Sequence, residues 1–244
     1  FGSYVTITLS NAGEVSGAEW HEKSNSFWIV DDGQSGIGHL IEIDLTGSIK
    51  GSYGLEGDLE AIAIVDPTSD YIYVGKELDG NYPKIVKWNT ATHSSTDDSW
   101  ILEDMPNCGN SMEALTFIEN DGTGDIFYAG EQCYGKIYKY RIKPDGNKDF
   151  LGTIDKPTGA SNDLAALYFD RTYQVLYWLY DDPDPAKLFA TRKNSNVAID
   201  SWDVPTPGMQ ESFCLKETNA YLGKDVGSYS SGQFYKVPFY GIRY

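Results

Sequence analysis

A segment of about fifty residues recurs five times along this chain of 244 residues, and no other feature of the sequence constrains the fold as strongly. Each copy opens with two short runs of alternating apolar residues joined by a turn, which is the pattern of a β-hairpin. The copies align on five positions, which are Glu19, Glu60, Glu113, Ala165 and Glu211. The spacings between these positions are 41, 53, 52 and 46 residues, a period typical of the four-stranded blades of a β-propeller.

The remainder of each copy supplies further strands. A third strand, rich in β-branched and aromatic residues, follows each hairpin at residues 39–44, 84–89, 136–142, 187–192 and 233–239. A fourth strand closes the first four copies, but the fifth copy reaches Tyr244 without one. Residues 4–12 alternate like a strand and have the length to supply the missing one.

We therefore predict an all-β protein with a single domain. It is a five-bladed β-propeller of four-stranded antiparallel blades, in which the N-terminal strand completes the last blade. The predicted blades span residues 13–55, 56–106, 107–157, 158–207 and 208–244 plus 4–12. An all-β sandwich with chance similarity between its strands is the alternative. It does not explain the fivefold recurrence of a turn flanked by acids.

The acidic composition excludes several classes of partner. The 36 acidic and 19 basic side chains give a net charge of −17, whereas nucleic-acid binders need clustered Lys and Arg. The same charge disfavours binding to anionic membranes. No run approaches the roughly 18 apolar residues that a spanning helix needs. We expect a soluble monomer that neither binds nucleic acid nor inserts into a membrane.

The recurring acids are predicted to meet at one mouth of the propeller. The first strand of each blade lines the central channel and the second runs back beside it, so the start of one and the end of the other lie at the same mouth. The predicted first ring consists of Glu19, Glu60, Glu113, Asp163 and Glu211, with Asp163 standing in for Ala165. The second ring, at the ends of the second strands, consists of Asp32, Glu77, Glu131, Asp181 and Asp225.

Carboxylates on a narrow axis raise one another's pKa and need a counter-charge. A hard cation with oxygen ligands supplies it, and Ca²⁺ accepts six to eight oxygens in flexible geometry, so we predict Ca²⁺ at the first ring. Zinc is disfavoured because His21, His39 and His93 lie in different contexts. Two alternatives stay open: a ring neutralised by protons, waters and lysines such as Lys76 and Lys224, and acids that are solvated surface residues.

Three cysteines allow one disulfide. Cys108 precedes the first strand of the third blade and Cys133 follows its second strand, so both are expected at the acidic mouth and a disulfide between them is predicted. Cys214 lies between Phe213 and Leu215 and is expected to be a buried thiol. The disulfide and the start at Phe1 favour an extracellular or periplasmic location.

Two functions fit this pattern. One is a calcium-binding module whose mouth binds a small molecule or a carbohydrate on aromatic residues, for which the candidates are Tyr82, Trp100, Tyr134, Tyr180 and Tyr229. The alternative is a Ca²⁺-dependent hydrolase of a lactone, ester or phosphoester, with His21, Asp32 and Glu131 as catalytic candidates. His21 can equally be a hydrogen-bonded core histidine, and the aromatic residues can equally pack between blades.

Three motifs between residues 15 and 80 are shared with a known family: "SGAEWHEKSNSFWIVDDG" from Ser16, "HLIEIDLTGSI" from His39 and "GDLEAIAIV…YIYVGKE" from Gly57 to Glu77. Through them this part of the chain resembles the SdiA-regulated family of β-propellers. The resemblance implies a calcium-associated propeller. A looser resemblance, through Glu19-Trp20, the segment 31–33 and the segment 75–77, is to the calcium-activated nucleotidases, five-bladed propellers with an axial Ca²⁺ held largely by Glu. Six-bladed lactonases and phosphotriesterases with axial Ca²⁺ are more distantly similar.

Overall fold

The computed structural model describes residues 1–10, 13–34, 36–108, 111–182, 185–224 and 231–242, and within these residues the chain forms β-strands and no helix. It follows that no described helix is long and apolar enough to cross a membrane. The strands are, in chain order, β1 (Val5–Ser10), β2 (Gly17–His21), β3 (Ser26–Gln34), β4 (Ile37–Ile43), β5 (Ile49–Glu56), β6 (Leu59–Ala63), β7 (Tyr71–Asp79), β8 (Tyr82–Asn89), β9 (Ser94–Ile101), β10 (Met112–Asn120), β11 (Asp125–Glu131), β12 (Ile137–Ile142), β13 (Lys148–Ile154), β14 (Leu164–Asp170), β15 (Val175–Tyr180), β16 (Lys187–Arg192), β17 (Ala198–Asp203), β18 (Gln210–Lys216), β19 (Asn219–Lys224) and β20 (Ser231–Pro238).

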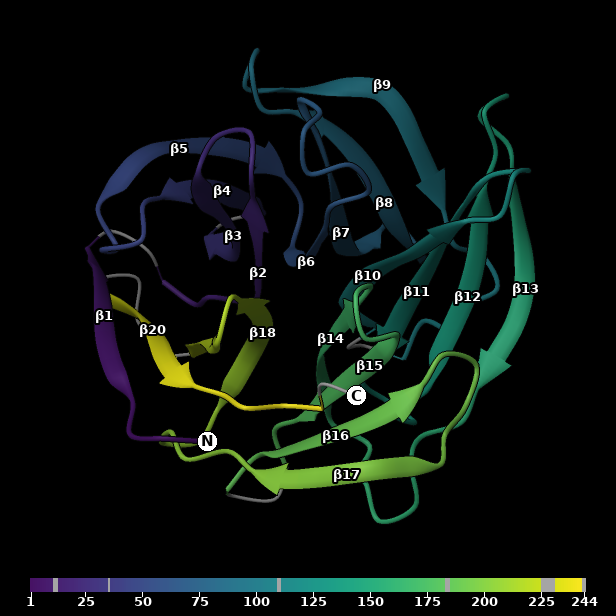
Figure 1. Cartoon of the computed structure of the whole chain (residues 1–244). Coiled ribbons are helices and arrows are strands. Elements are labelled where there is room, and N and C mark those ends of the chain that lie inside the picture. The colour runs from purple at the N-terminus through teal and green to yellow at the C-terminus, as the bar shows by residue number, and fades with distance from the viewer. Residues whose placement is uncertain (11–12, 35, 109–110, 183–184, 225–230, 243–244) are drawn as a thin grey trace.

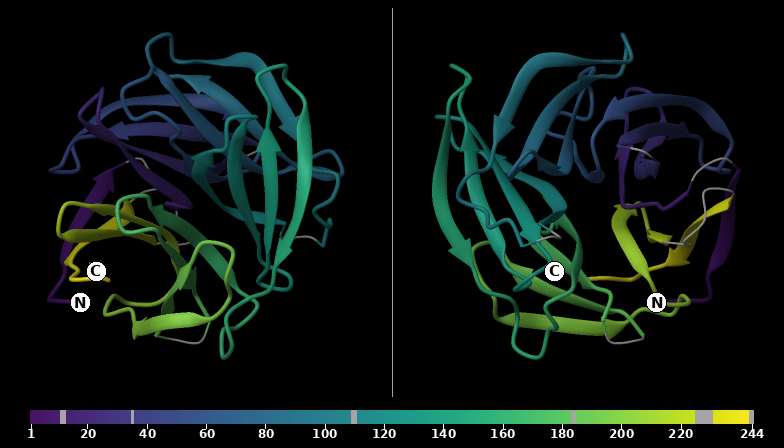
Figure 2. Two further views of the ribbon diagram at one scale, coloured as in Figure 1. Left: turned by 45° about the vertical axis from the view of Figure 1, so that its right-hand side comes forward. Right: turned by 180° about the vertical axis from the view of Figure 1, so that it is seen from behind.

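The strands form five four-stranded antiparallel sheets arranged in a ring (Figure 1; two further views in Figure 2). Four sheets use consecutive strands, in the orders β2-β3-β4-β5, β6-β7-β8-β9, β10-β11-β12-β13 and β14-β15-β16-β17. The innermost strands β2, β6, β10, β14 and β18 contact their neighbours all around the ring. The predicted five-bladed propeller is confirmed.

The fifth sheet is closed by the N-terminal strand, as predicted. Its order is β18-β19-β20-β1, and β1 pairs antiparallel with β20 from Val5 opposite Lys236 to Leu9 opposite Gly232. Leu9 is fully buried and packs in a cluster with Phe27 and Phe234, between the last blade and the first. Strand β1 therefore joins two blades as well as completing one sheet.

The core lies between adjacent sheets. Inner strands are buried on both faces, so β6 is apolar at four of its five positions, whereas the outer strand β5 alternates between exposed and partly buried residues. Small residues let the inner strands approach closely. A Cβ on Gly17 would lie 3.0 Å from the Cα of Ala61 and 2.9 Å from Cγ2 of Val30, so any larger residue there would push the first two blades apart. This close approach keeps the channel narrow.

Candidate metal centre at one mouth of the channel

Four of the five inner strands carry a β-bulge at the same position. In each, the pairing with the second strand steps over one residue, for example from Leu59 to Ala61 in β6. The residues stepped over are Glu60 in β6, Glu113 in β10, Ala165 in β14 and Glu211 in β18. A bulge removes a residue from the regular ladder and re-aims its side chain. Three glutamates of the predicted first ring therefore stand at one level of the channel.

These bulges border a cavity of about 10 Å³ on the channel axis, lined by Ser16, Glu60 and Glu113 at the level of the bulges. This volume is about the room of one water molecule or one monatomic ion. The deeper wall is apolar and consists of Ala18, Ile62, Leu115, Leu167 and Phe213. The site is therefore polar on its outer side and closed by hydrocarbon on its inner side.

The first blade differs from the predicted alignment. Gly17 pairs with Val30 as Ala61 pairs with Gly75, so the residue equivalent to Glu60 is Ser16 and not Glu19. Ser16 is 2% exposed, and its Oγ has no hydrogen-bond partner among the described residues. A buried hydroxyl without a partner is costly unless something binds it.

Glu19 lies three residues further along the strand, beyond the apolar layer, where it lines a different cavity together with Tyr168 and Arg171. Burial raises the pKa of Glu19 to about 8, against the opposing charge of Arg171. The prediction of Glu19 in the first ring is therefore wrong by three residues, because the bulge that sets the level of the other glutamates has no counterpart in β2.

A further layer of acids lies two residues before the ring position of three blades. Glu14, Asp58 and Asp163 stand two residues before Ser16, Glu60 and Ala165, respectively. Of these three acids, only Asp163 belongs to the ring predicted from the sequence. The recurring spacing of an acid two residues before the ring position was the signal that could have identified the others.

Main-chain carbonyl groups two residues before the ring positions accept hydrogen bonds from the ends of the second strands. The amide of Glu77 donates to Asp58 O (3.0 Å), that of Gln132 to Ser111 O (3.2 Å) and that of Asp181 to Asp163 O (3.1 Å). The residue equivalent to Glu77 in the third blade is therefore Gln132, whose side-chain amide reaches Asp163 Oδ1 at 2.5 Å. Asp32 occupies the same position in the first blade, two residues after Val30. Asp225 lies outside the described residues.

Glu131 was predicted in the second ring but faces away from it. It is fully buried, and its carboxylate accepts hydrogen bonds from the amides of Tyr134 (3.0 Å) and Lys136 (3.3 Å). Glu131 pairs with Met112 as Lys76 pairs with Leu59, so the residue equivalent to Glu77 is Gln132 and not Glu131. Glu131 fixes the loop between β11 and β12 and is not a rim carboxylate.

One cluster of carboxylates joins Glu60 of the first ring, Glu77 of the second ring and Asp58. Oxygens of Asp58, Glu60 and Glu77 all lie within 4.8 Å of one another. Oxygens bound to one Ca²⁺ at 2.3–2.6 Å can be separated by at most about 5.2 Å, so these three residues are close enough to share an ion. The amide of Ser111 donates to Glu77 Oε1 (3.0 Å) and fixes the orientation of that carboxylate.

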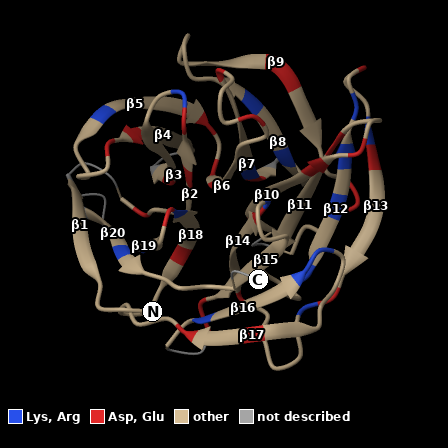
Figure 3. Ribbon diagram, viewed as in Figure 1, with Lys and Arg blue, Asp and Glu red and all other residues tan. Residues whose placement is uncertain are grey.

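Burial raises the pKa of several carboxyl groups of the site, so that their ionised form is disfavoured. Burial raises the pKa of Glu113 to about 8, and the charges of Glu77 and Glu14 add to the shift. Burial is also the main reason why the pKa of Glu77 rises to about 7 and why those of Glu60 and Glu211 lie well above the ordinary value. Figure 3 shows an acidic segment on the inner strand β18, where Glu211 lies. Without a cation, these groups hold protons near neutral pH.

The disulfide is confirmed. Cys108 and Cys133 are bonded, with their Cα atoms 6.4 Å apart, and Cys214 is buried and reduced. The bond ties the segment before β10 to the loop after β11. Ser111, which contacts Glu77, follows within the same segment, so the disulfide lies next to the carboxylate cluster.

His21 is a core histidine. Its Nε2–H donates to Ser69 O (2.9 Å), and Nδ1 contacts the hydroxyl of Ser24 (2.9 Å). It is fully buried at the end of β2 away from the acidic mouth. Together with the placement of Glu131, this leaves Asp32 as the only one of the three catalytic candidates at the mouth.

The predicted aromatic platform is dispersed. Tyr82 and Tyr134 are exposed, at 39% and 55%. Tyr180 is fully buried and donates to Gly135 O (3.0 Å), and the indole of Trp100 is buried and donates to Gly146 O (2.9 Å). These two pack between elements, and Tyr229 lies outside the described residues.

No protein-family model matches the chain, and no curated protein matches its sequence, so the resemblance to the SdiA-regulated family is not confirmed. The fold is similar to that of the β-propeller domain of Myceliophteria thermophila Cps50 (Swd1), with a TM-score of 0.51 and 10% identity over 90% of this chain and 65% of that chain. It is also similar to Kuenenia stuttgartiensis hydrazine synthase, with a TM-score of 0.51 and 10% identity over 88% of this chain and 56% of that chain. This chain thus spans less than two thirds of either protein, and similarity at 10% identity concerns the fold alone.

Proposed function

We propose that this protein is a calcium-binding β-propeller whose acidic mouth holds an axial Ca²⁺ ion. The observation that carries the proposal is the set of bulges that bring Glu60, Glu113 and Glu211 to one level of the channel, where Glu60 and Glu113 line an ion-sized cavity. The buried Oγ of Ser16 offers a neutral oxygen on the same cavity. Carboxylates and a hydroxyl around a small enclosed volume form the donor set of a hard cation.

The choice of Ca²⁺ follows from the donors. The residues that line the cavity include neither His nor Cys, which argues against zinc. The three glutamates at the bulges come from three different blades. Ca²⁺ tolerates irregular geometry, whereas Mg²⁺ needs a near-ideal octahedron and retains several waters.

The proposed role of the ion is structural. A bound Ca²⁺ supplies positive charge that offsets the mutual repulsion of the carboxylates and links inner strands of different blades. The disulfide supports an oxidising compartment, extracellular or periplasmic, where Ca²⁺ is plentiful and millimolar affinity suffices. A Ca²⁺-dependent hydrolase and the monomeric state stay predictions, since no contact of the described residues favours either.

Calcium titration tests the proposal. Chelator-treated protein, titrated by calorimetry, should bind Ca²⁺ and should bind Mg²⁺ more weakly. At a Ca²⁺ concentration of about 100 times Kd, the free energy of unfolding should rise by about 2.7 kcal/mol, which for a chain of this size raises Tm by about 5–11 °C. Absence of bound Ca²⁺ together with equal Tm in Ca²⁺ and in chelator would contradict the axial-site proposal.

The stability of the metal-free protein should fall with rising pH. The pKa values of Glu77 and Glu113, about 7 and about 8, lie above the ordinary value of 4.5, so the folded state binds more protons than the unfolded state between these limits. The resulting stability is complete below about pH 4.5 and is lost as the pH rises through about 8. Urea midpoints in chelator should therefore decrease from pH 5 to pH 8.5, and excess Ca²⁺ should flatten the trend.

A matched pair of variants separates this effect from the general negative charge. Glu113→Gln should flatten the pH profile in chelator. Glu103→Gln should not, because Glu103 is an exposed carboxylate whose pKa is lowered by Lys148. Midpoints that increase from pH 5 to pH 8.5 in chelator would contradict the assignment of raised pKa values.

A further inference from the structure

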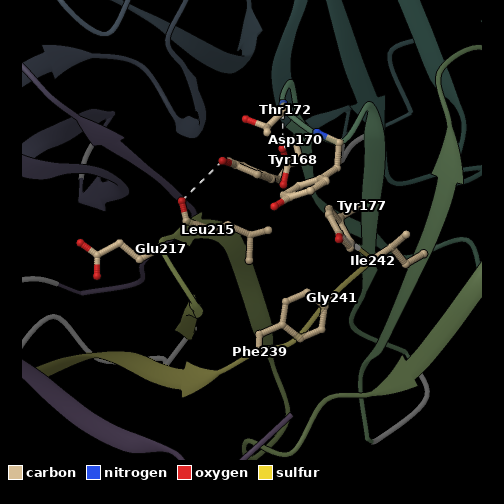
Figure 4. Close-up of a pocket in the computed structure, with 10 residues that line it drawn as sticks. Tyr168, Asp170, Thr172, Tyr177, Leu215, Glu217, Phe239, Gly241 and Ile242 are labelled. Carbon is tan, nitrogen blue, oxygen red and sulfur yellow. Dashed lines mark hydrogen bonds between the residues drawn. The ribbon is translucent and has the colours of Figure 1, made fainter. Parts of the chain in front are cut away.

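A third cavity, which shares Tyr168, Asp170 and Thr172 with the cavity beside Glu19, lies on the opposite side of the propeller from the bulges, between the fourth and fifth blades. It has a volume of about 310 Å³, at the lower end of the usual range of ligand pockets. It adjoins the ends of β14 and β18, whose other ends carry Ala165 and Glu211 at the acidic mouth. Figure 4 shows the side chains that surround it. The cavity is thus separate from the candidate metal centre.

Aromatic rings make up much of its wall. Tyr168, Tyr173, Tyr177 and Phe239 all line the cavity. Tyr177 and Phe239 are buried and meet edge to face, with ring centroids 5.7 Å apart. The hydroxyl of Tyr168 donates to Leu215 O at 3.4 Å, the dashed contact of Figure 4. These contacts fix three of the four rings in place before any ligand arrives.

A fixed carboxylate lies beside these rings. Oδ1 of Asp170 accepts hydrogen bonds from the amides of Thr172 (2.9 Å) and Tyr173 (3.1 Å), and Asp170 lines the cavity together with Tyr168 (Figure 4). Glu217 lies at the edge of the same cavity. Burial, followed by the charge of Glu19, holds the pKa of Tyr168 well above its ordinary value, and Asp170 contributes in the same direction. Arg171 acts on the pKa of Tyr168 in the opposite direction, and the charged side chains that line the cavity are Asp170 and Glu217.

The described residues that line the cavity include no Lys, Arg or His. Two cations lie close in sequence, but each is engaged elsewhere. Arg171 donates to Val65 O (2.7 Å) and its guanidinium lies 5.4 Å from the ring centroid of Phe117. Lys216 donates to Glu22 (3.2 Å) and lies 4.3 Å from the ring centroid of Trp20. Neither side chain lines this cavity, although Arg171 lines the cavity beside Glu19, which shares Tyr168 and Asp170 with this one. The charged side chains that line the cavity itself are Asp170 and Glu217.

We propose that this cavity binds a small organic cation, an ammonium ion with apolar substituents. Aromatic faces attract a cation through their quadrupole, and a desolvated site strengthens that attraction. The carboxylate of Asp170 supplies the complementary charge, and the rings accommodate the alkyl groups. A net charge of −17 also attracts a cation toward the protein. This inference does not rest on the calcium proposal.

Choline and its uncharged isostere 3,3-dimethylbutan-1-ol are the test probes. They have nearly the same shape and differ in charge. Binding is measured by calorimetry at constant ionic strength and in excess Ca²⁺, which suppresses binding of choline to the acidic mouth. Choline should bind at least about tenfold more tightly than the alcohol, a difference within the range of a desolvated cation–aromatic contact. Equal binding of the two probes, or no binding of choline, overturns the proposal.

Variants locate the site. Asp170→Asn keeps the oxygen that accepts the two amide hydrogen bonds but removes the charge, and it should weaken choline binding about fivefold to tenfold. The matched control is Asp66→Asn, because Oδ1 of Asp66 caps the equivalent hairpin of the second blade through the amide of Thr68 (2.9 Å) and lies outside the cavity. This control should leave the affinity unchanged. Equal losses in both variants would show non-specific attraction to an acidic protein and overturn the proposal.

Tyr173 provides an independent check. Its side chain is partly exposed and packs against the core cluster of the last two blades, and Arg192 donates to its main-chain oxygen. Leu and Phe keep an apolar side chain at this position, so both variants should retain the fold. Tyr173→Leu should weaken choline binding at least about fivefold and Tyr173→Phe should preserve it, because phenylalanine retains the ring. Melting curves verify folding of each variant. Equal affinity of the Leu and Phe variants, or tighter binding of glucose than of choline, contradicts the assignment.

Discussion

The variant Glu113→Gln is expected to be less stable than the wild type in Ca²⁺ and more stable than the wild type in chelator at pH 8.5. In Ca²⁺ it loses a buried charged ligand, and a fall of about 100-fold in affinity corresponds to about 2.8 kcal/mol. In chelator at pH 8.5, above its pKa of about 8, Glu113 is ionised beside Glu77 and Glu14, and glutamine removes that repulsion. Opposite signs in the two conditions distinguish a metal ligand from a purely structural residue.

The experiment compares melting temperatures and calorimetric Ca²⁺ affinity. In saturating Ca²⁺ the variant should melt about 6–11 °C below the wild type, given about 2–4 °C per kcal/mol for a chain of this size. The matched control is Glu119→Gln, which changes the same residue type at the other end of β10, where Glu119 forms a partly exposed ion pair with Lys193 (2.6 Å). Surface pairs contribute little, so this control should bind Ca²⁺ normally. A Glu113→Gln variant with wild-type Ca²⁺ affinity would exclude Glu113 as a ligand.

Removal of strand β1 is expected to destabilise the protein by at least about 5 kcal/mol, enough to unfold most domains of this kind. The deletion exposes the whole edge of β20 and removes Leu9 from the cluster that contains Phe27 and Phe234. A buried leucine alone contributes about 2–5 kcal/mol when truncated to alanine. The truncated chain, starting at Gly13, should show a collapsed urea midpoint and should bind a synthetic peptide of residues 1–12.

Two point variants divide this effect. Leu9→Ala should cost about 2–5 kcal/mol because Leu9 is fully buried. Val5→Ala, in the same strand but 62% exposed, should cost less than about 0.5 kcal/mol. If the truncated chain unfolds with the same urea midpoint as the intact one, β1 does not close the ring in solution.

The fold could be predicted because the repeat is long and each copy carries the same alternation of apolar residues. The missing fourth strand of the last copy and the spare strand at residues 4–12 determined how the ring closes. Both features show which segments form strands, and neither depends on the exact position of a residue along the channel.

The candidate site depends on the position of each side chain along the channel, which the sequence predicts less well than the strands. A bulge is a property of strand pairing, and the sequence does not mark it, so the aligned glutamate at position 19 was preferred to the equivalent Ser16. Glu131 and Gln132 differ by one position, and only the register decides which of them faces the mouth. The glutamates at 60, 113 and 211 were aligned correctly because their blades share the bulge.

The pairing of Val5 with Lys236 also imposes an order of events on folding. Four blades are made of consecutive strands and can form one after another while the chain is being synthesised. The last blade needs both ends of the chain, so β1 is made first and waits without its partner until β20 has emerged. Closure of the ring is then a contact of the longest sequence separation, which carries a loop-closure cost that local contacts do not. We therefore expect ring closure to be the slow step of folding and the unpaired edge of β20 to be the surface most exposed to mispairing before it occurs.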